Sequence, residues 1–195
     1  MLAPIGRWFN RVANLKTSHR MWAPICATED TSMSIIRSKQ DIRLTVPSSI
    51  ESTQDVDAWL TSMNDSCWRV LTGFRNWPDW VPGVRSVKQT DTEPPARGTK
   101  LHVDTGHKMT TGSIDRWDPP RSLQVSIDLA PGEIAYGFLI ETNPENPEIR
   151  ISLDLEHRLT GVSRIAAVFF RWRLQKLGPR ILSNLAARTR PAKHN

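Results

Sequence analysis

Between residues 84 and 160, apolar and polar residues alternate in short runs separated by turn-forming residues such as Asp118-Pro119-Pro120. A period of two is typical of β-strands with one apolar face and one wet face. The connections are too short to hold crossover helices, so an antiparallel meander is expected. Its strands are predicted at 84–91, 99–105, 108–117, 122–130, 134–142 and 148–159.

A helical pattern follows at 162–188, where Phe169 and Trp172 share one face with other apolar residues. The apolar face of the predicted sheet needs a cover, and this helix is the candidate, with both aromatic rings pointing inward. The alternative is a basic amphipathic surface helix that binds an anionic membrane. Gly178 and Pro179 are expected to kink or break it.

The segment before the meander fits two assignments. Apolar residues recur at helical spacing over 53–72, and Ser52 could cap such a helix. Alternatively, the apolar residues Val56, Ala58 and Leu60 occupy every second position, as in a β-strand. We adopt a strand at 55–62 and a helix at 64–73, with Asn64 as N-cap and Gly73 ending it in the left-handed conformation. Upstream, alternation over 42–46 predicts a strand that Pro47 ends or confines to an edge.

The predicted helix leads into a loop in which Phe74, Trp77 and Trp80 are interleaved with Pro78 and Pro82. Prolines prevent a long regular element, and the large aromatic rings require burial. Two interpretations stay open: a lid over a cavity, or a tryptophan-rich plug of an ordinary core.

These residues resemble a known family. Trp68, Leu71, the W-P-x-W of 77–80 and Pro82-Gly83 are similar to the opening of the START/Bet v1-like (SRPBCC) proteins, in their polyketide cyclase/dehydrase-like branch. Members usually carry Asp where this chain has Gly73. The resemblance covers residues 55–190 and implies an α+β helix-grip fold, a curved antiparallel sheet wrapped around a long C-terminal helix with a cavity between them.

The resemblance also implies binding of a small hydrophobic molecule, such as a lipid, isoprenoid, aromatic or polyketide. No cofactor is expected, because the sequence has no phosphate-binding loop or nucleotide fingerprint. The alternative is a core filled by the eight tryptophans. If a cavity is present, its lining is expected to come from Trp77, Trp80, Val81, Trp117, Val125, Ile127, Tyr136, Phe138, Ile151, Leu153, Phe169 and Trp172.

No catalytic constellation stands out, so a non-catalytic binder is the leading hypothesis. A cyclase or dehydratase is the alternative that the family allows, with Tyr136, His157 and Asp115 as polar groups facing the cavity. His102 and Asp104 are expected to face solvent. Cys67 is interpreted as a small core residue, and metal binding has no support because HExxH and paired CxxC patterns are absent.

The net charge of +6 is concentrated at the two ends. Residues 1–28 hold four basic residues and 161–195 hold eight, with no acidic residue in either segment, whereas 29–160 hold 14 basic and 20 acidic residues. This pattern argues against a nucleic-acid groove in the body of the fold. It is compatible with transient contact between the basic ends and an anionic membrane.

The expected organisation is a basic tail at 1–40, a domain at 41–190 and a short tail at 191–195. The first 28 residues have the composition of an organelle transit peptide; competing interpretations are a flexible tail and translation that starts at Met33.

No apolar run approaches the ~20 residues that span a membrane, and two distant cysteines suggest reduced thiols. A soluble, cytoplasmic protein is therefore expected. A mitochondrial quinone-binding chaperone, similar to the coenzyme Q-binding START proteins, is a further alternative; the oligomeric state is not predicted.

Overall fold

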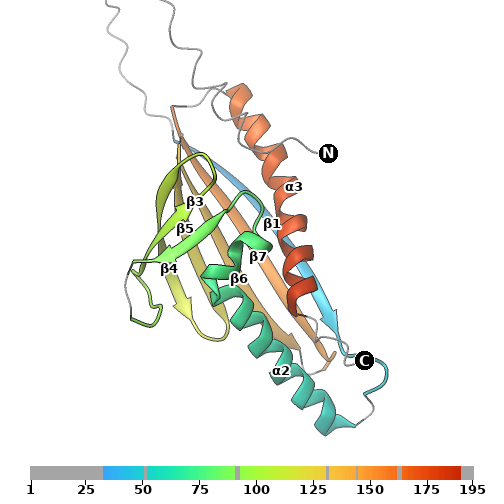
Figure 1. Cartoon of the computed structure of the whole chain (residues 1–195). Coiled ribbons are helices and arrows are strands. Elements are labelled where there is room, and N and C mark those ends of the chain that lie inside the picture. The colour runs from blue at the N-terminus through green and yellow to red at the C-terminus, as the bar shows by residue number, and fades with distance from the viewer. Residues whose placement is uncertain are drawn as a thin grey trace, which may run out of the picture.

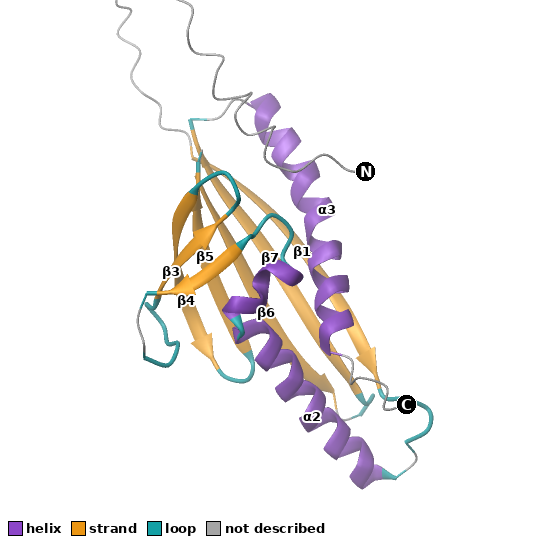
Figure 2. Cartoon of the chain, viewed as in Figure 1, coloured by secondary structure: helices purple, strands orange, loops and turns teal. Residues whose placement is uncertain are grey.

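The fold is one antiparallel sheet with helices packed on one of its sides (Figures 1 and 2). The computed structural model describes residues 33–50, 52–90, 93–130, 132–143, 145–161 and 164–189. Within these residues the strand order is β1-β7-β6-β5-β4-β3-β2. The strands are β1 (Met33–Thr45), β2 (Ser86–Gln89), β3 (Lys100–Asp104), β4 (Met109–Asp118), β5 (Ser122–Leu129), β6 (Gly132–Asn143) and β7 (Glu148–Thr160). The helices are α2 (Thr53–Thr72), the 3-10 helix η3 (Phe74–Asp79) and α3 (Arg164–Thr189).

The meander predicted from the alternation is confirmed, with the six strand positions matching β2 to β7 within two residues at either end. Antiparallel pairing runs from β2 to β7 without a crossover. The inward residues of β5 and β7 are fully buried, and α3 packs against β1, β7 and α2. The predicted fold class, a curved antiparallel sheet with a long C-terminal helix, is therefore confirmed.

Strand β1 is longer than predicted and changes the expected boundary of the tail. It pairs with β7 along its whole length, from Met33 opposite Thr160 to Thr45 opposite Glu148. Residues 33–40, which were expected to belong to the tail, are thus the first part of a sheet strand. The transit-peptide interpretation concerns residues that lie outside the described part of the chain.

The assignment of 55–62 as a strand is wrong, because a single helix, α2, covers this segment. Its cap is Ser52, whose hydroxyl oxygen accepts a hydrogen bond from the Asp55 backbone N–H at 3.1 Å. Asp55 itself lies in the first turn, where a carboxylate complements the helix dipole. The inward side of α2 then follows helical spacing, with buried Leu60, Met63, Cys67 and Leu71.

Gly73 ends α2, but not in the left-handed conformation that was predicted. Its φ is −75° and its N–H donates to the carbonyl of Arg69 at 3.0 Å. A Cβ at this position would stand only 3.0 Å from the same carbonyl oxygen. Close approach to the last helical turn, rather than a positive φ, therefore explains the glycine.

Helix α3 turns a different face to the sheet from the predicted one. Its buried residues are Leu174, Ile181, Leu182, Leu185, Ala186 and Thr189. Phe169 and Trp172 remain 46% and 51% exposed, so their predicted inward orientation is wrong. Apolar residues occur on two sides of this helix, and spacing alone did not distinguish the sides.

The predicted break at Gly178-Pro179 is also wrong, since α3 continues through both residues. Proline has no N–H to donate to the carbonyl four residues earlier, which belongs to Gln175. Instead, the Gln40 side-chain amide of β1 donates to that carbonyl at 3.1 Å. Gly178 allows this approach, because a Cβ there would meet the Gln40 amide group at 3.1 Å. Strand β1 thus replaces the hydrogen bond that Pro179 removes.

Removing residues 1–32 should leave the melting temperature within a few degrees of the full chain, because every described element begins at or after Met33. Removing residues 1–40 should lower it by at least about 10 °C, since Ile36, the ladder to β7 and Gln40 are lost together. Thermal melts of both shortened chains test this expectation. Equal melting temperatures would show that the first part of β1 adds little stability.

Candidate functional site: the aromatic interior

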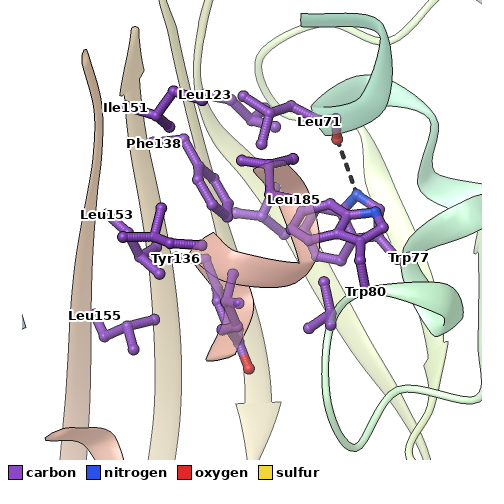
Figure 3. Close-up of a cluster of buried hydrophobic side chains, with 14 of the residues drawn as sticks. Leu71, Trp77, Trp80, Leu123, Tyr136, Phe138, Ile151, Leu153, Leu155 and Leu185 are labelled. Atoms are coloured by element: carbon purple, nitrogen blue, oxygen red, sulfur yellow. Dashed lines mark hydrogen bonds between the residues drawn. The ribbon is translucent and has the colours of Figure 1, made fainter. Parts of the chain in front are cut away.

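Four aromatic rings form a cluster between the sheet and η3 (Figure 3). The Trp77 ring makes an edge contact with Trp80 at a centroid distance of 5.6 Å and another with Tyr136 at 6.3 Å. Trp80 in turn contacts Phe138 of β6 at 5.9 Å. All four side chains are buried, so the rings that were expected to line a cavity pack against one another in the interior.

The two indole N–H groups of this cluster differ in their hydrogen bonding. Trp77 Nε1 donates to the carbonyl of Leu71 at 2.9 Å, as the dashed line in Figure 3 shows. Trp80 Nε1 is buried and has no hydrogen-bond partner. Its backbone is held from the other side, because the Asn184 side-chain amide of α3 donates to the Trp80 carbonyl at 3.1 Å. The cluster therefore contains one buried donor that the protein itself leaves unpaired.

Most of the predicted lining residues come together in this interior, and two do not. The buried ones are Trp77, Trp80, Val81, Val125, Ile127, Tyr136, Phe138, Ile151 and Leu153. Trp117 is partly buried and packs against Trp68 of α2 at a centroid distance of 5.2 Å. Phe169 and Trp172 lie on the solvent side of α3, away from the cluster.

The α3 residues that do face the interior were missed as site residues. Leu185 is fully buried and lies among the aromatic residues in Figure 3. Ile181 and Leu174 continue the same stripe toward the start of the helix. Spacings of seven and four residues along 174, 181 and 185 were present in the sequence, but the larger rings at 169 and 172 suggested the opposite face.

Two polar residues on the concave side lie close to each other across β6 and β7. Tyr136 is in register with Leu155, and His157 with Ile134, which makes Tyr136 and His157 diagonal neighbours on one face. Burial raises the pKa of Tyr136 above its ordinary value, so the phenol stays protonated. Burial also lowers the pKa of His157 to about 4, so the imidazole is neutral near pH 7.

His157 is covered by the N-terminal half of α3. The Phe170 ring meets the imidazole edge-on at a centroid distance of 5.1 Å. His157 Nε2 is buried without a hydrogen-bond partner, the second such side-chain atom in the described part of the chain. The neighbouring ionic residues in β7, Glu156 and Arg158, point to the opposite face and pair there.

Asp115 does not face the interior, contrary to the enzyme hypothesis. A β-bulge lies between Ile114 and Arg116, so the extra residue Asp115 breaks the parity that linked it to Trp117. Its carboxylate accepts hydrogen bonds from Ser113 and Ser126. These groups lie on the outer face of the sheet.

That outer face is wet and ionic. Glu156 accepts from Arg37 at 2.8 Å and from Arg158 at 2.7 Å. Partial burial would raise the pKa of Glu156, but the hydrogen bonds and charges of these two arginines outweigh it and lower the pKa. Exposed pairs of this kind add little stability, so the face is best understood as a solvated surface.

The remaining candidates have structural roles. His102 is exposed, as predicted, and Asp104 accepts a hydrogen bond from the Gly106 N–H at 2.6 Å within the following turn. Cys67 is fully buried; burial raises the pKa of its thiol to about 11, although a hydrogen bond with Thr189 partly offsets the shift. Among the described residues, no group of three or more His, Cys, Asp or Glu side chains could hold a metal ion.

Comparison with protein-family models shows to which family this chain belongs. The model of the family described as "Polyketide cyclase / dehydrase and lipid transport" matches residues 63–190. The chain belongs to this family. The match confirms the predicted resemblance to the SRPBCC superfamily and its polyketide cyclase-like branch. Comparison with curated protein sequences finds no match.

Solved structures show the same fold at low sequence identity. A hypothetical protein from Helicobacter pylori, jhp0584, superposes with a TM-score of 0.58 at 12% identity, over 89% of this chain and all (100%) of that one. The di-domain ARO/CYC protein BexL gives 0.55 at 14% identity, over 78% of this chain and 45% of its own. Ara h 8.0201 gives 0.50 at 12% identity, over 79% and 99%. These likenesses establish a Bet v1-like fold. None of the helices in the described ranges is long and apolar enough to cross a membrane.

The buried His157 predicts a specific dependence of stability on pH. Its pKa is about 4 in the folded protein and about 6.5 when unfolded, so the unfolded chain binds the extra proton first. Stability should be complete above pH 6.5 and fall by about 3 kcal/mol as the pH drops to 4. Denaturant unfolding across this range measures the change.

His157→Leu should remove this pH dependence, while His102→Gln, at an exposed position, should keep it. If His157→Leu and the wild-type protein lose stability in parallel between pH 6.5 and 4, burial of His157 is not the cause.

Proposed function

We propose that the protein binds a small hydrophobic molecule between the sheet, η3 and the C-terminal half of α3. The classes expected are lipids, isoprenoids, aromatics and polyketides. The observation that carries the proposal is Trp80 Nε1, a buried hydrogen-bond donor without a partner in the cluster of four aromatic rings. The family to which the chain belongs, described by cyclase, dehydrase and lipid transport activities, supports the same function.

An unpaired buried donor is costly. Leaving such a group without a partner costs about 1–3 kcal/mol, and proteins satisfy most of their buried polar atoms. A carbonyl, hydroxyl or carboxyl oxygen of a ligand would accept the Trp80 hydrogen bond and recover that energy. Ligand sites typically combine an apolar lining with a few such orienting groups.

Room for the ligand comes from movement of the aromatic segment rather than of the sheet. Trp77 and Trp80 lie in and after a 3-10 helix of six residues, outside the strand ladder. The Trp80 ring is flanked by Trp77 and Phe138, and its backbone is held by Asn184. A shift of the Trp80 ring away from Phe138, with Trp77 still bonded to the Leu71 carbonyl, opens space next to the unpaired indole N–H.

A second candidate function is a cyclase or dehydratase, which the diagonal placement of Tyr136 and His157 favours. The protonated phenol could donate a hydrogen bond to a substrate carbonyl. The neutral imidazole of His157 could accept, at Nε2, a proton from the substrate carbon next to that carbonyl. Asp115 has no part in this version, because its carboxylate lies on the outer face.

Native mass spectrometry of the gently purified protein tests the proposed binding, and a fluorophore assay locates it. Anilinonaphthalene sulfonate is expected to bind the wild-type protein and to be displaced by fatty acids or isoprenoids. Trp80→Phe keeps an aromatic ring but removes the donor, so displacement by carbonyl-containing ligands should weaken by about 5- to 20-fold. Arg116→Ala, on the outer face, should behave as wild type.

A protein that carries no ligand in native spectra and binds no fluorophore would refute the proposal. If binding is intact in Trp80→Phe, the site lies elsewhere. Incubation with a linear polyketone separates the two candidates, because an enzyme would release a dehydrated or cyclised product and a binder would return it unchanged.

A further inference from the structure

Three exposed apolar side chains gather on two turns of α3. Val168 is 69% exposed, Phe169 46% and Trp172 51%. The described residues contain two other exposed large apolar side chains, Ile35 on β1 and Met109 on β4, which lie on separate strands. The Phe169 and Trp172 rings lie 6.2 Å apart and only 31° from parallel. We refer to these three residues as the α3 patch.

The α3 patch is not left over from core packing. The opposite side of the same helix packs Phe170 on His157 and buries Leu174 and Ile181. Positions 168 and 172 are four apart, so they lie one above the other on the outer side. Helix α3 therefore has two apolar sides, one used by the sheet and the other facing solvent.

Positive charge surrounds the α3 patch. Exposed Arg171, Lys176 and Arg180 belong to the same helix, and the Lys176 ammonium lies 4.0 Å above the centre of the Trp172 ring. Residues 161–195 contain eight basic and no acidic residues. A partner that binds this surface must therefore offer an apolar region for the aromatic rings and negative charge for the basic side chains.

We propose that the α3 patch docks on the surface of a lipid bilayer that contains anionic lipids. Trp172 and Phe169 would enter the interface between headgroups and acyl chains, where aromatic side chains are favoured. Arg171, Lys176 and Arg180 would contact lipid phosphates, and α3 would lie in the plane of the membrane. The proposal goes beyond ligand binding and stands without it.

Other occupants fit the patch less well. The chain's own segment 1–28 carries four basic residues and no acidic one, so it would be repelled by α3. A second copy of the described domain offers acidic groups, but several of them already pair with arginines, as in Arg150–Asp41 and Arg158–Glu133. Outside α3, the large exposed apolar side chains of the described domain are Ile35 and Met109, which lie on separate strands and form no patch of matching size.

Co-sedimentation of the full chain with phosphatidylcholine vesicles, with and without phosphatidylglycerol, tests the docking. The wild-type protein should bind the anionic vesicles at least about tenfold more strongly. Phe169→Ser with Trp172→Ser should weaken that binding at least about tenfold, because the inserted apolar area is lost. Met109→Ser, an equally exposed apolar position elsewhere, should leave it unchanged.

A second pair of variants tests the charges independently of the rings. Arg171→Glu with Lys176→Glu should reduce binding of anionic vesicles to the level of phosphatidylcholine alone. Arg97→Glu with Arg116→Glu makes the same change in net charge at exposed positions outside α3 and should cost less than about threefold. Melting temperatures should stay near wild type for all variants, since the positions are exposed.

Three results would overturn the proposal. The full chain could fail to bind anionic vesicles. Binding could survive both α3 variants but disappear when residues 1–32 are removed, which would place it in the basic N-terminal segment. Finally, sedimentation could show a lipid-free dimer that Phe169→Ser with Trp172→Ser dissociates, which would make the patch an interface between copies. Fluorophore binding in the α3 variants reports on the ligand site separately.

Discussion

The hydrogen bond from Trp77 Nε1 to the Leu71 carbonyl is the interaction on which the concave side depends. It ties η3 to the end of α2 and sets the position of a fully buried indole. Phe74, Trp80 and Tyr136 all pack against that indole. A curved sheet with one apolar face must be covered, and here a short aromatic segment covers the space that two helices leave between them.

The same arrangement explains where polar atoms remain unpaired. Trp77 uses the helix-end carbonyl as its acceptor, whereas Trp80, three residues on, has its indole N–H without a partner. On the other side of the interior, Phe170 covers His157 Nε2. Within the described ranges, both unpaired buried side-chain atoms belong to the concave side, and none of the outer-face ionic groups is among them. Functional sites are where such unsatisfied groups are expected in a protein that otherwise pairs its buried polar atoms.

Much of the fold could be predicted from the sequence, since a period of two over β5 and β7 follows directly from one buried face. The errors have physical causes. Val56, Ala58 and Leu60 satisfy both a strand and a helix pattern, and only the packing of Met63 and Cys67 on the core decides for α2. The extra residue at the β4 bulge turned Asp115 outward, which no parity argument detects. Helix α3 has apolar residues on two sides, and the larger rings, Phe169 and Trp172, were therefore assigned to the core side although they are exposed.

For the candidate site, the sequence placed Trp77, Trp80, Tyr136 and Phe138 correctly in the interior. It could not foresee which of the two indoles would lack an acceptor, because that depends on the distance between η3 and the end of α2. Nor did it show that Gln40 would take the place of the hydrogen bond missing at Pro179, which fixes α3 against β1. The first feature depends on the exact geometry of a six-residue connection. The second depends on a contact between segments 135 residues apart.

The most direct test of the account is the indole N–H resonance of Trp80 in the nitrogen–proton correlation spectrum, assigned through Trp80→Phe. On saturation with a fatty acid, or with an isoprenoid that carries a hydroxyl or carbonyl oxygen, the account predicts a downfield shift of the Trp80 indole proton, since it gains an acceptor. Trp77, which already has an acceptor, should change little. A ligand that binds tightly yet leaves Trp80 unshifted, or that shifts only the exposed Trp172, would contradict it.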